Sequence, residues 1–178
     1  MPRLRRRALL PSSLKRAKPV APTRPKGILR SILRAPVYLY RWNLGWLLGH
    51  RFLLLIHTGR RTGSPHQTVL EVMEYRKQGP EVVVMSGFGP NSDWLRNIEV
   101  TPVLEVIVGS QRFIANYRRL DEREAVEVVQ NYEERNWFMA PIVRWVIGRL
   151  VGWKYRGSEA DQQRLVRELP LIAFSPRS

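Results

Sequence analysis

The 178-residue sequence contains no cysteine. Disulfide bonds, thiolate metal ligands and cysteine nucleophiles are therefore excluded. Long apolar runs are also missing, since no stretch approaches the roughly 18 residues that a membrane-spanning helix needs. After the arginines at 5–7 the apolar residues 8–10 are ended by Pro11, so the h-region of a secretory signal is absent and we expect a cytoplasmic protein. An arginine-rich, acid-poor leader is also typical of an organelle transit peptide, which stays open.

Acidic residues are missing from the first part of the chain. Residues 1–70 hold 15 Lys and Arg and no Asp or Glu, whereas residues 71–178 hold 15 of each. The whole net charge of +15 therefore comes from the first 70 residues. A large positive charge suggests nucleic acid, but here it belongs to one end of the chain and the remainder is neutral. We expect no specific nucleic-acid partner.

The N-terminal part is predicted to consist of two segments. Residues 1–26 are basic and interrupted by five prolines, which predicts a disordered arm. Residues 27–50 have a helical pattern, broken near Pro36, with basic residues gathered along one side. These residues are Lys26, Arg30, Arg34 and Arg41. Such a helix either lies on a barrel with its charges in water or binds at an anionic membrane surface together with the arm, and both readings stay open.

Residues 51–178 are predicted to form one barrel-like domain. Five β-type runs are separated by turn signals, with hairpin turns at 77–80 and 109–110. The runs are Phe52–His57, Gln67–Tyr75, Val82–Ser86, Val103–Val108 and Arg112–Leu120. Helices are expected at 92–100, from Asp121 with Glu124 completing a capping box, and at 139–151. The fold class is therefore α+β, mostly β: an antiparallel barrel with flanking helices.

The most informative motif is the turn at residues 57–63, His-Thr-Gly-Arg-Arg-Thr-Gly. It follows the strand Phe52–Ile56, which is so apolar that both of its faces must be buried. Two glycines four residues apart allow tight backbone geometry, and two adjacent guanidinium groups offer forked donors for phosphate or carboxylate. By its chemistry the turn is an anion cradle, although a solvated hairpin has the same spacing.

A second motif runs from the strand ending near Ser86 through a glycine-rich loop into the helix predicted at Ser92. The N–H groups at the start of that helix point back toward the loop and favour an anion or the edge of a ring. Trp94 and Asn97 share one helical face, which places an aromatic wall beside an amide unless Trp94 is simply part of the core.

With these residues the chain resembles the deazaflavin-dependent nitroreductases, also called F420H2-dependent quinone reductases. The matches are residues 58–63, the loop 86–89 and the segment 94–98. The resemblance implies a split β-barrel of the FMN-binding type that binds coenzyme F420, with the tail at Arg60 and Arg61. The expected cofactor contacts are Thr58, Gly59, Arg60, Arg61, Thr62, Gly63, Thr68, Ser86, Gly87, Phe88, Gly89, Trp94 and Asn97. Ser86 and Tyr132 are the expected catalytic residues.

The implied reaction is hydride transfer from a reduced deazaflavin to a small organic acceptor of the quinone or nitro type. We expect an apolar acceptor mouth at Trp137, Phe138 and Trp145. An FMN-binding oxidoreductase on the same barrel, and a basic membrane- or nucleic-acid-binding module without catalysis, remain alternatives. No metal is expected, because no carboxylate lies in residues 1–70 to complete a site with the three histidines. The sequence predicts no oligomeric state.

Overall fold

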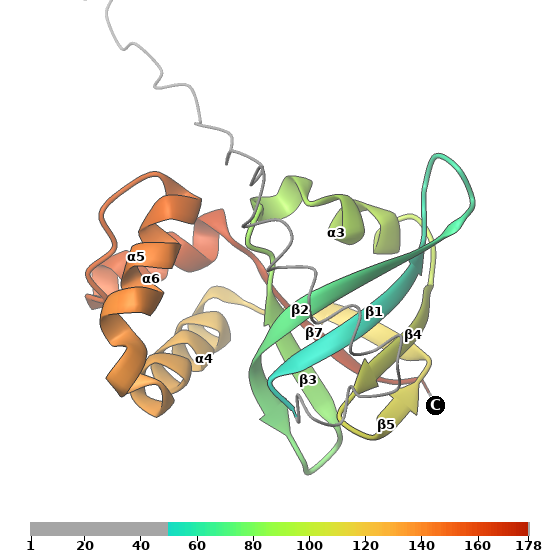
Figure 1. Ribbon diagram of the computed structural model, residues 1–178, viewed down its shortest axis with the longest axis horizontal. Coiled ribbons are helices and arrows are strands. Elements are labelled where there is room, and N and C mark those ends of the chain that lie inside the picture. The colour runs from blue at the N-terminus through green and yellow to red at the C-terminus, as the bar shows by residue number, and fades with distance from the viewer. Residues whose placement is uncertain (1–49, 178) are drawn as a thin grey trace, which may run out of the picture.

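The computed structural model describes residues 50–177 (Figure 1). The predicted arm and nearly all of the predicted helix at 27–50 lie outside these residues, so both remain predictions. Seven strands and four α-helices follow one another, with single 3-10 turns at Gly89–Asn91 (η2) and Trp137–Met139 (η3). The strands are β1 (Phe52–Thr58), β2 (Pro65–Arg76), β3 (Glu81–Met85), β4 (Val103–Val108), β5 (Gln111–Phe113), β6 (Ala115–Arg119) and β7 (Leu171–Pro176). The helices are α3 (Asp93–Ile98), α4 (Glu122–Arg135), α5 (Ala140–Val151) and α6 (Glu159–Glu168).

All seven strands belong to one antiparallel sheet in the order β5-β4-β1-β2-β3-β7-β6. The sheet curls until β6, at one edge, lies against β4 near the other edge. The result is a nearly closed barrel, with α3 over one end and α4, α5 and α6 gathered at one side (Figure 1). The predicted mostly-β split barrel with flanking helices is confirmed.

The first strand holds the centre of the barrel. β1 pairs with β2 on one side and β4 on the other, and Leu53 and Leu55 are both 0% exposed. Leu54, on the opposite face, is only 4% exposed. The prediction that this apolar strand is covered on both faces is confirmed.

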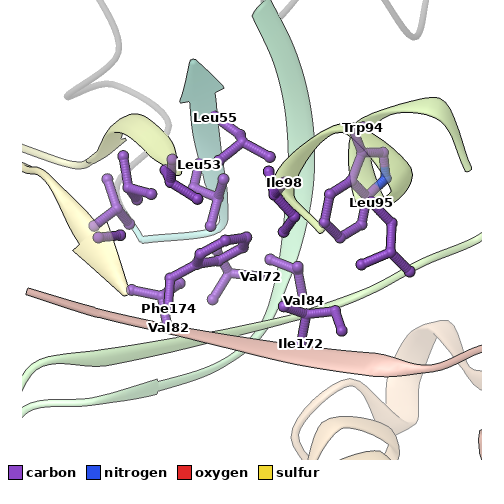
Figure 2. Packing of buried hydrophobic residues seen from close by; sticks show 14 residues of the cluster. Leu53, Leu55, Val72, Val82, Val84, Trp94, Leu95, Ile98, Ile172 and Phe174 are labelled. Carbon is purple, nitrogen blue, oxygen red and sulfur yellow. The ribbon is translucent and has the colours of Figure 1, made fainter. Parts of the chain in front are cut away.

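Side chains on the two faces of β3 enter two different cores. Val82 and Val84 point into the barrel, where Trp94 of α3 and Phe174 of β7 pack beside them (Figure 2). Val83 faces the other way, into a core made with α4 and α6. The period of two residues along a strand thus separates the barrel interior from the layer beneath the helices.

Three elements differ from the sequence-based expectation. The run expected at 112–120 forms two strands, β5 and β6, which Ile114 separates. Neither α6 nor β7 was predicted. β7 fits between β3 and β6 and its first four residues are buried, so its strand conformation depends on partners distant in the sequence. Such non-local pairing leaves little local signal.

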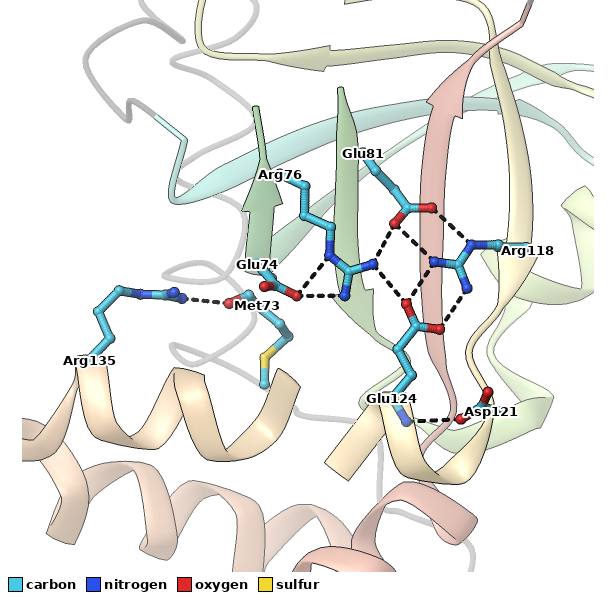
Figure 3. Close-up of polar contacts among 8 residues, drawn as sticks. All are labelled: Met73, Glu74, Arg76, Glu81, Arg118, Asp121, Glu124 and Arg135. Carbon is cyan, nitrogen blue, oxygen red and sulfur yellow. Dashed lines mark hydrogen bonds and ion pairs between the residues drawn. The ribbon is translucent and has the colours of Figure 1, made fainter. Parts of the chain in front are cut away.

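The start of α4 is fixed partly as predicted. Asp121 is the N-cap, and its carboxylate accepts a hydrogen bond from the N–H of Glu124 at 2.8 Å. The carboxylate of Glu124 binds Arg76 at 2.7 Å and Arg118 at 2.7 Å (Figure 3). Glu124 therefore ties the helix to β2 and β6.

Glu81 of β3 completes this ion-pair network, because it binds the same two arginines at 2.7 and 2.9 Å. Hydrogen bonds from Arg118, and then from Arg76, lower the pKa of Glu124 to about 2. The Glu124 side chain is 24% exposed, so solvent screens the interaction only in part. The network fixes the angle at which α4 leaves the barrel.

We expect Glu124→Gln to lower the free energy of unfolding by about 2 kcal/mol at pH 7. A carboxyl group whose pKa is depressed in the folded state stabilises it fully above the unfolded pKa and loses this effect as pH falls toward 2. The difference from wild type should therefore shrink between pH 4.5 and 2 in urea titrations. Glu127→Gln, at an exposed position of α4, is the control, and a difference that stays constant with pH would contradict the proposed role.

Candidate functional site

The turn between β1 and β2 is closed by its own backbone. The N–H of Gly59 donates to the carbonyl of Ser64, and the N–H of Gly63 donates to the carbonyl of Gly59, both at 2.8 Å. Gly63 has a φ of +67°, which favours glycine. A Cβ at Gly59 would lie 2.5 Å from Nε2 of His66. Each glycine of the motif is thus required by a different local constraint.

The two adjacent arginines have different surroundings. The side chain of Arg60 is only 16% exposed, and its guanidinium donates to Oδ1 of Asn97 at 2.8 Å and pairs with Asp93 at 3.1 Å. Arg61 is exposed and makes no hydrogen bond or ion pair within residues 50–177. Arg60 therefore fastens the turn to α3, and Arg61 is the arginine available to a ligand.

Asn97 is the centre of a buried hydrogen-bond chain. Its Oδ1 also accepts from the main-chain N–H of Arg60 at 3.1 Å, so its Nδ2 donates to Nδ1 of His57 at 3.1 Å. His57 Nδ1 must then be an acceptor, which places the ring proton on Nε2, 3.2 Å from Oγ1 of Thr68. The chain of partners assigns both the amide orientation and the histidine tautomer.

His57 is 2% exposed, and burial lowers its pKa, with a further contribution from the neighbouring His66. A neutral ring is what the hydrogen bond from Asn97 requires. The predicted cofactor contacts Thr68 and Asn97 therefore meet through His57, which opens the predicted turn motif but was not among the expected cofactor contacts.

The second predicted segment is a tightly bonded loop. Oγ of Ser86 lies 2.7 Å from the carbonyl oxygen of Gly89 and 2.6 Å from Oγ of Ser92, and Ser92 is 3.0 Å from the same carbonyl. The hydroxyl protons of Ser86 and Ser92 are the two donors for these three contacts. Both protons are therefore donated within the loop. Ser86 is 0% exposed, and its N–H donates to the carbonyl of Pro170 at 2.9 Å.

The exposed aromatic side chain of this loop is Phe88 at 39%, whereas Trp94 is 6% exposed and packs against Phe174 in the barrel core. A Cβ at Gly87 would lie 3.6 Å from Cδ1 of Leu150 in α5. Gly89 has a φ of +70° and lies close to the carbonyl of Glu168. The loop thus runs beneath α5 and the end of α6, and Phe88 is better placed than Trp94 to contact a ring.

The two predicted catalytic residues lie on opposite sides of the sheet. Ser86 continues the inward-facing positions of β3, whereas Tyr132 packs in the helix-side core and donates to Glu71 at 2.7 Å. Burial, followed by the Glu71 carboxylate, raises the pKa of Tyr132. Glu71 pairs with Phe52 of β1 and precedes Val72, which pairs with Val84 of β3, so the Tyr132–Glu71 pair lies beside the end of β3 that leads into Ser86. The two residues therefore approach the same end of the sheet from opposite faces, and their catalytic roles remain predictions.

The expected acceptor mouth has a different geometry from the one predicted. Trp137, Phe138 and Trp145 are 74%, 64% and 67% exposed. They lie on the outer surface of η3 and α5 rather than around an apolar cavity. The side of α5 that packs against the fold is the side that carries Ile147, its buried residue. A pocket of about 320 Å³ includes Trp137, but it is lined mostly by polar residues of α4 and α6.

A family model described as F420H(2)-dependent quinone reductase matches residues 33–139. The chain belongs to the F420H2-dependent quinone reductase family. It is therefore an oxidoreductase that uses coenzyme F420. The matched part includes the turn, the glycine-rich loop and α3, and ends before α5. This membership decides between the deazaflavin and the FMN reading of the barrel.

Solved structures that are similar to this chain are distant in sequence. An F420-H2 dependent reductase is 16% identical, over 71% of this chain and 96% of that chain, with a TM-score of 0.41. An FMN-binding, pyridoxamine 5′-phosphate oxidase-related protein from Nostoc punctiforme is 15% identical over 85% and 81%, with a TM-score of 0.42. The heme storage protein HutZ from Vibrio cholerae is 14% identical over 79% and 91%, with a TM-score of 0.44. Comparison with curated protein sequences gives no match.

In this member of the quinone reductase family, the sequence reading missed Asp93 and His57. Asp93 precedes Asn97 by four residues, so both lie on one face of α3, and this spacing is a signal that could have been found. No local pattern marks His57, because its partners come from β2 and α3. Of the segments predicted to form the site, the turn and the loop both adjoin α3, whereas Tyr132 lies elsewhere.

We expect Asn97→Leu to lower the free energy of unfolding by about 2–4 kcal/mol, because it leaves the Arg60 N–H and His57 Nδ1 without partners. Urea denaturation measures the loss, and Asn131→Leu, at an exposed position of α4, should change stability by less than about 0.5 kcal/mol. Equal effects of the two substitutions would mean that the Asn97 chain does not hold the turn.

Proposed function

We propose that this chain transfers a hydride from reduced coenzyme F420 to a small organic acceptor of the quinone or nitro type. The observation that carries the proposal is that the β1–β2 turn has unpaired hydrogen-bond donors among the described residues. Its Arg61 side chain and the main-chain N–H groups of Arg61 and Thr62 have no partner within residues 50–177, while Arg60 holds the turn in place. Unpaired N–H donors next to a guanidinium group are able to bind an anionic group.

The residues present fit the coenzyme's anionic tail. Phosphate and carboxylate groups accept forked hydrogen bonds from a guanidinium, which Arg61 can supply. We assign Arg60 the role of fixing the position of Arg61 through Asp93 and Asn97. Thr58, Gly59, Thr62 and Gly63 shape the turn, and Thr68 orients His57 behind it. The acid-free first 70 residues add a positive field that attracts a polyanion.

The glycine-rich loop is proposed to lie beside the coenzyme's ring. Gly87 and Gly89 let the loop pass close beneath α5 and the end of α6, and between them Phe88 presents an exposed aromatic face. When bound, the reduced deazaflavin supplies a hydride from its ring carbon. The protein's task is then to hold donor and acceptor in register and to exclude water. Reduction of a quinone to a hydroquinone consumes that hydride and one proton.

Ser86 is proposed to act as a positioning residue. Its hydroxyl proton is used within the loop by Gly89 and Ser92, so its effect on the reaction passes through the shape of the backbone at Gly87–Gly89. Tyr132 is assigned no place at the reacting atoms, since its hydroxyl group is bonded to Glu71 on the helix side of the sheet.

We expect Arg61→Ala to weaken binding of coenzyme F420 at least about tenfold without changing the thermal midpoint, because Arg61 is exposed. Quenching of the coenzyme's fluorescence measures the affinity. Arg119→Ala, at an exposed position of β6, is the matched control and should bind like wild type. Full affinity in the Arg61 variant, or binding of FMN in preference to F420, would sink the proposal.

We expect Ser86→Ala and Ser92→Ala to have similar effects, because each removes one hydroxyl from the same three-contact set. Both should raise KM for the coenzyme several-fold and leave the pH profile of kcat unchanged in shape. Steady-state kinetics from pH 5.5 to 9 with a quinone acceptor test this. If Ser86→Ala alone abolished kcat and altered the profile, Ser86 would be a proton donor instead.

A further inference from the structure

The segment from η3 through α5 carries a continuous exposed apolar surface. Trp137, Phe138, Ile142, Trp145 and Val146 are 74%, 64%, 58%, 67% and 42% exposed. Most other exposed large apolar side chains of residues 50–177 are scattered singly over the barrel. We call these five residues the α5 face. A contiguous apolar patch on the surface of a monomer is often a functional contact site.

The α5 face follows from the register of the helix. At 100° per residue, Ile142, Trp145 and Val146 fall within about 100° of one another, and Ile147, the buried residue of α5, lies on the opposite side. Packing against the fold therefore uses one narrow side of the helix. The broader apolar side is turned outward by the same geometry, and Figure 1 shows α5 at the side of the molecule away from the barrel.

Charge around the α5 face is mainly positive, although Glu133 and Glu134 of α4 line a pocket together with Trp137 and Arg144. Residues 135–158 contain five basic residues and no Asp or Glu. These residues are Arg135, Arg144, Arg149, Lys154 and Arg156. Arg149 lies on the same side of α5 as Trp145, one turn further on. Tryptophan rings with arginines around them are typical of helices that lie in the interface of an anionic bilayer.

The size of the α5 face argues against a second copy of the chain as its partner. Its three aromatic side chains present roughly 400 Å², taking about 200 Å² for a fully exposed ring. A stable protein dimer usually buries about 800 Å² on each partner. Two copies would also bring their basic surfaces together, which costs free energy. None of the helices in residues 50–177 is long and apolar enough to cross a bilayer, and α5, with 12 residues, can only lie along one.

We propose that the α5 face docks the protein on an anionic lipid surface, with the aromatic rings in the headgroup region and the basic side chains on lipid phosphates. Leu150 of α5 lies beside Gly87, so docking brings the glycine-rich loop close to the bilayer. The docking itself does not depend on the proposed reaction, since its residues are separate from the β1–β2 turn.

The test uses the full chain without coenzyme and vesicles of phosphatidylglycerol and phosphatidylcholine. Sedimentation with the vesicles gives the partition coefficient, and brominated lipids report contact by quenching tryptophan fluorescence. The test variant is Trp137→Ser/Phe138→Ser/Trp145→Ser. The matched control, Val100→Ser/Leu104→Ser/Ile114→Ser, removes three exposed apolar side chains from other parts of the fold. Each protein is measured at low salt and at about 0.5 M salt, where charge interactions are largely screened.

We expect the test variant to partition at least about tenfold more weakly than wild type at both salt concentrations, with the control within about twofold. Binding to pure phosphatidylcholine should be weaker than to the anionic vesicles. Equal vesicle binding of wild type and test variant would overturn the proposal. Any membrane contact would then belong to basic segments outside the α5 face. Light scattering measures the oligomeric state of both proteins. A dimeric wild type and a monomeric test variant would overturn the proposal in favour of a second copy of the chain. Unchanged F420 affinity in the test variant separates this outcome from failure of the proposed reaction.

Discussion

The candidate site depends on one buried side-chain amide. The side-chain oxygen of Asn97 accepts hydrogen bonds from Arg60, and its nitrogen donates to His57. Only one orientation of the Asn97 amide satisfies both partners. Because a buried polar group without a partner is costly, the amide fixes the turn, the helix and the histidine tautomer together. The position of Arg61 in space follows from this, since its neighbour in the chain cannot move independently of α3.

The paired arginines show how one motif divides its tasks. The guanidinium group of Arg60 is bonded to Asp93 and Asn97, so few of its N–H donors are free for a ligand. The exposed guanidinium group of Arg61 keeps all of its donors. Arg60 and Arg61 are therefore not interchangeable, although the sequence presents them as a pair. The same division applies at the loop. The hydroxyl groups of Ser86 and Ser92 bond each other and the Gly89 carbonyl, whereas Phe88 remains exposed.

The helical side of the molecule is held by a different kind of interaction. Ion pairs of Glu124 and Glu81 with Arg76 and Arg118 join α4 to three strands, and an apolar core lies beneath α4 and α6. This arrangement leaves α5 attached by a narrow side. An apolar face on the outside is therefore a consequence of how α5 packs, and its proposed lipid partner supplies the contacts that the fold does not.

The sequence alone was enough to predict the strands with strong apolar patterns, the turn between β1 and β2, the start of α4 at Asp121 and the family. These features are local, because strand period, capping residues and glycine positions act over a few neighbours. It did not predict β7, nor that Ser86 and Tyr132 lie on opposite faces of the sheet. Which arginine is free, which aromatic residue is exposed and where Trp145 points were likewise decided only by tertiary structure. Each depends on a partner far away in the chain, and burial removes some side chains from use while leaving their neighbours available.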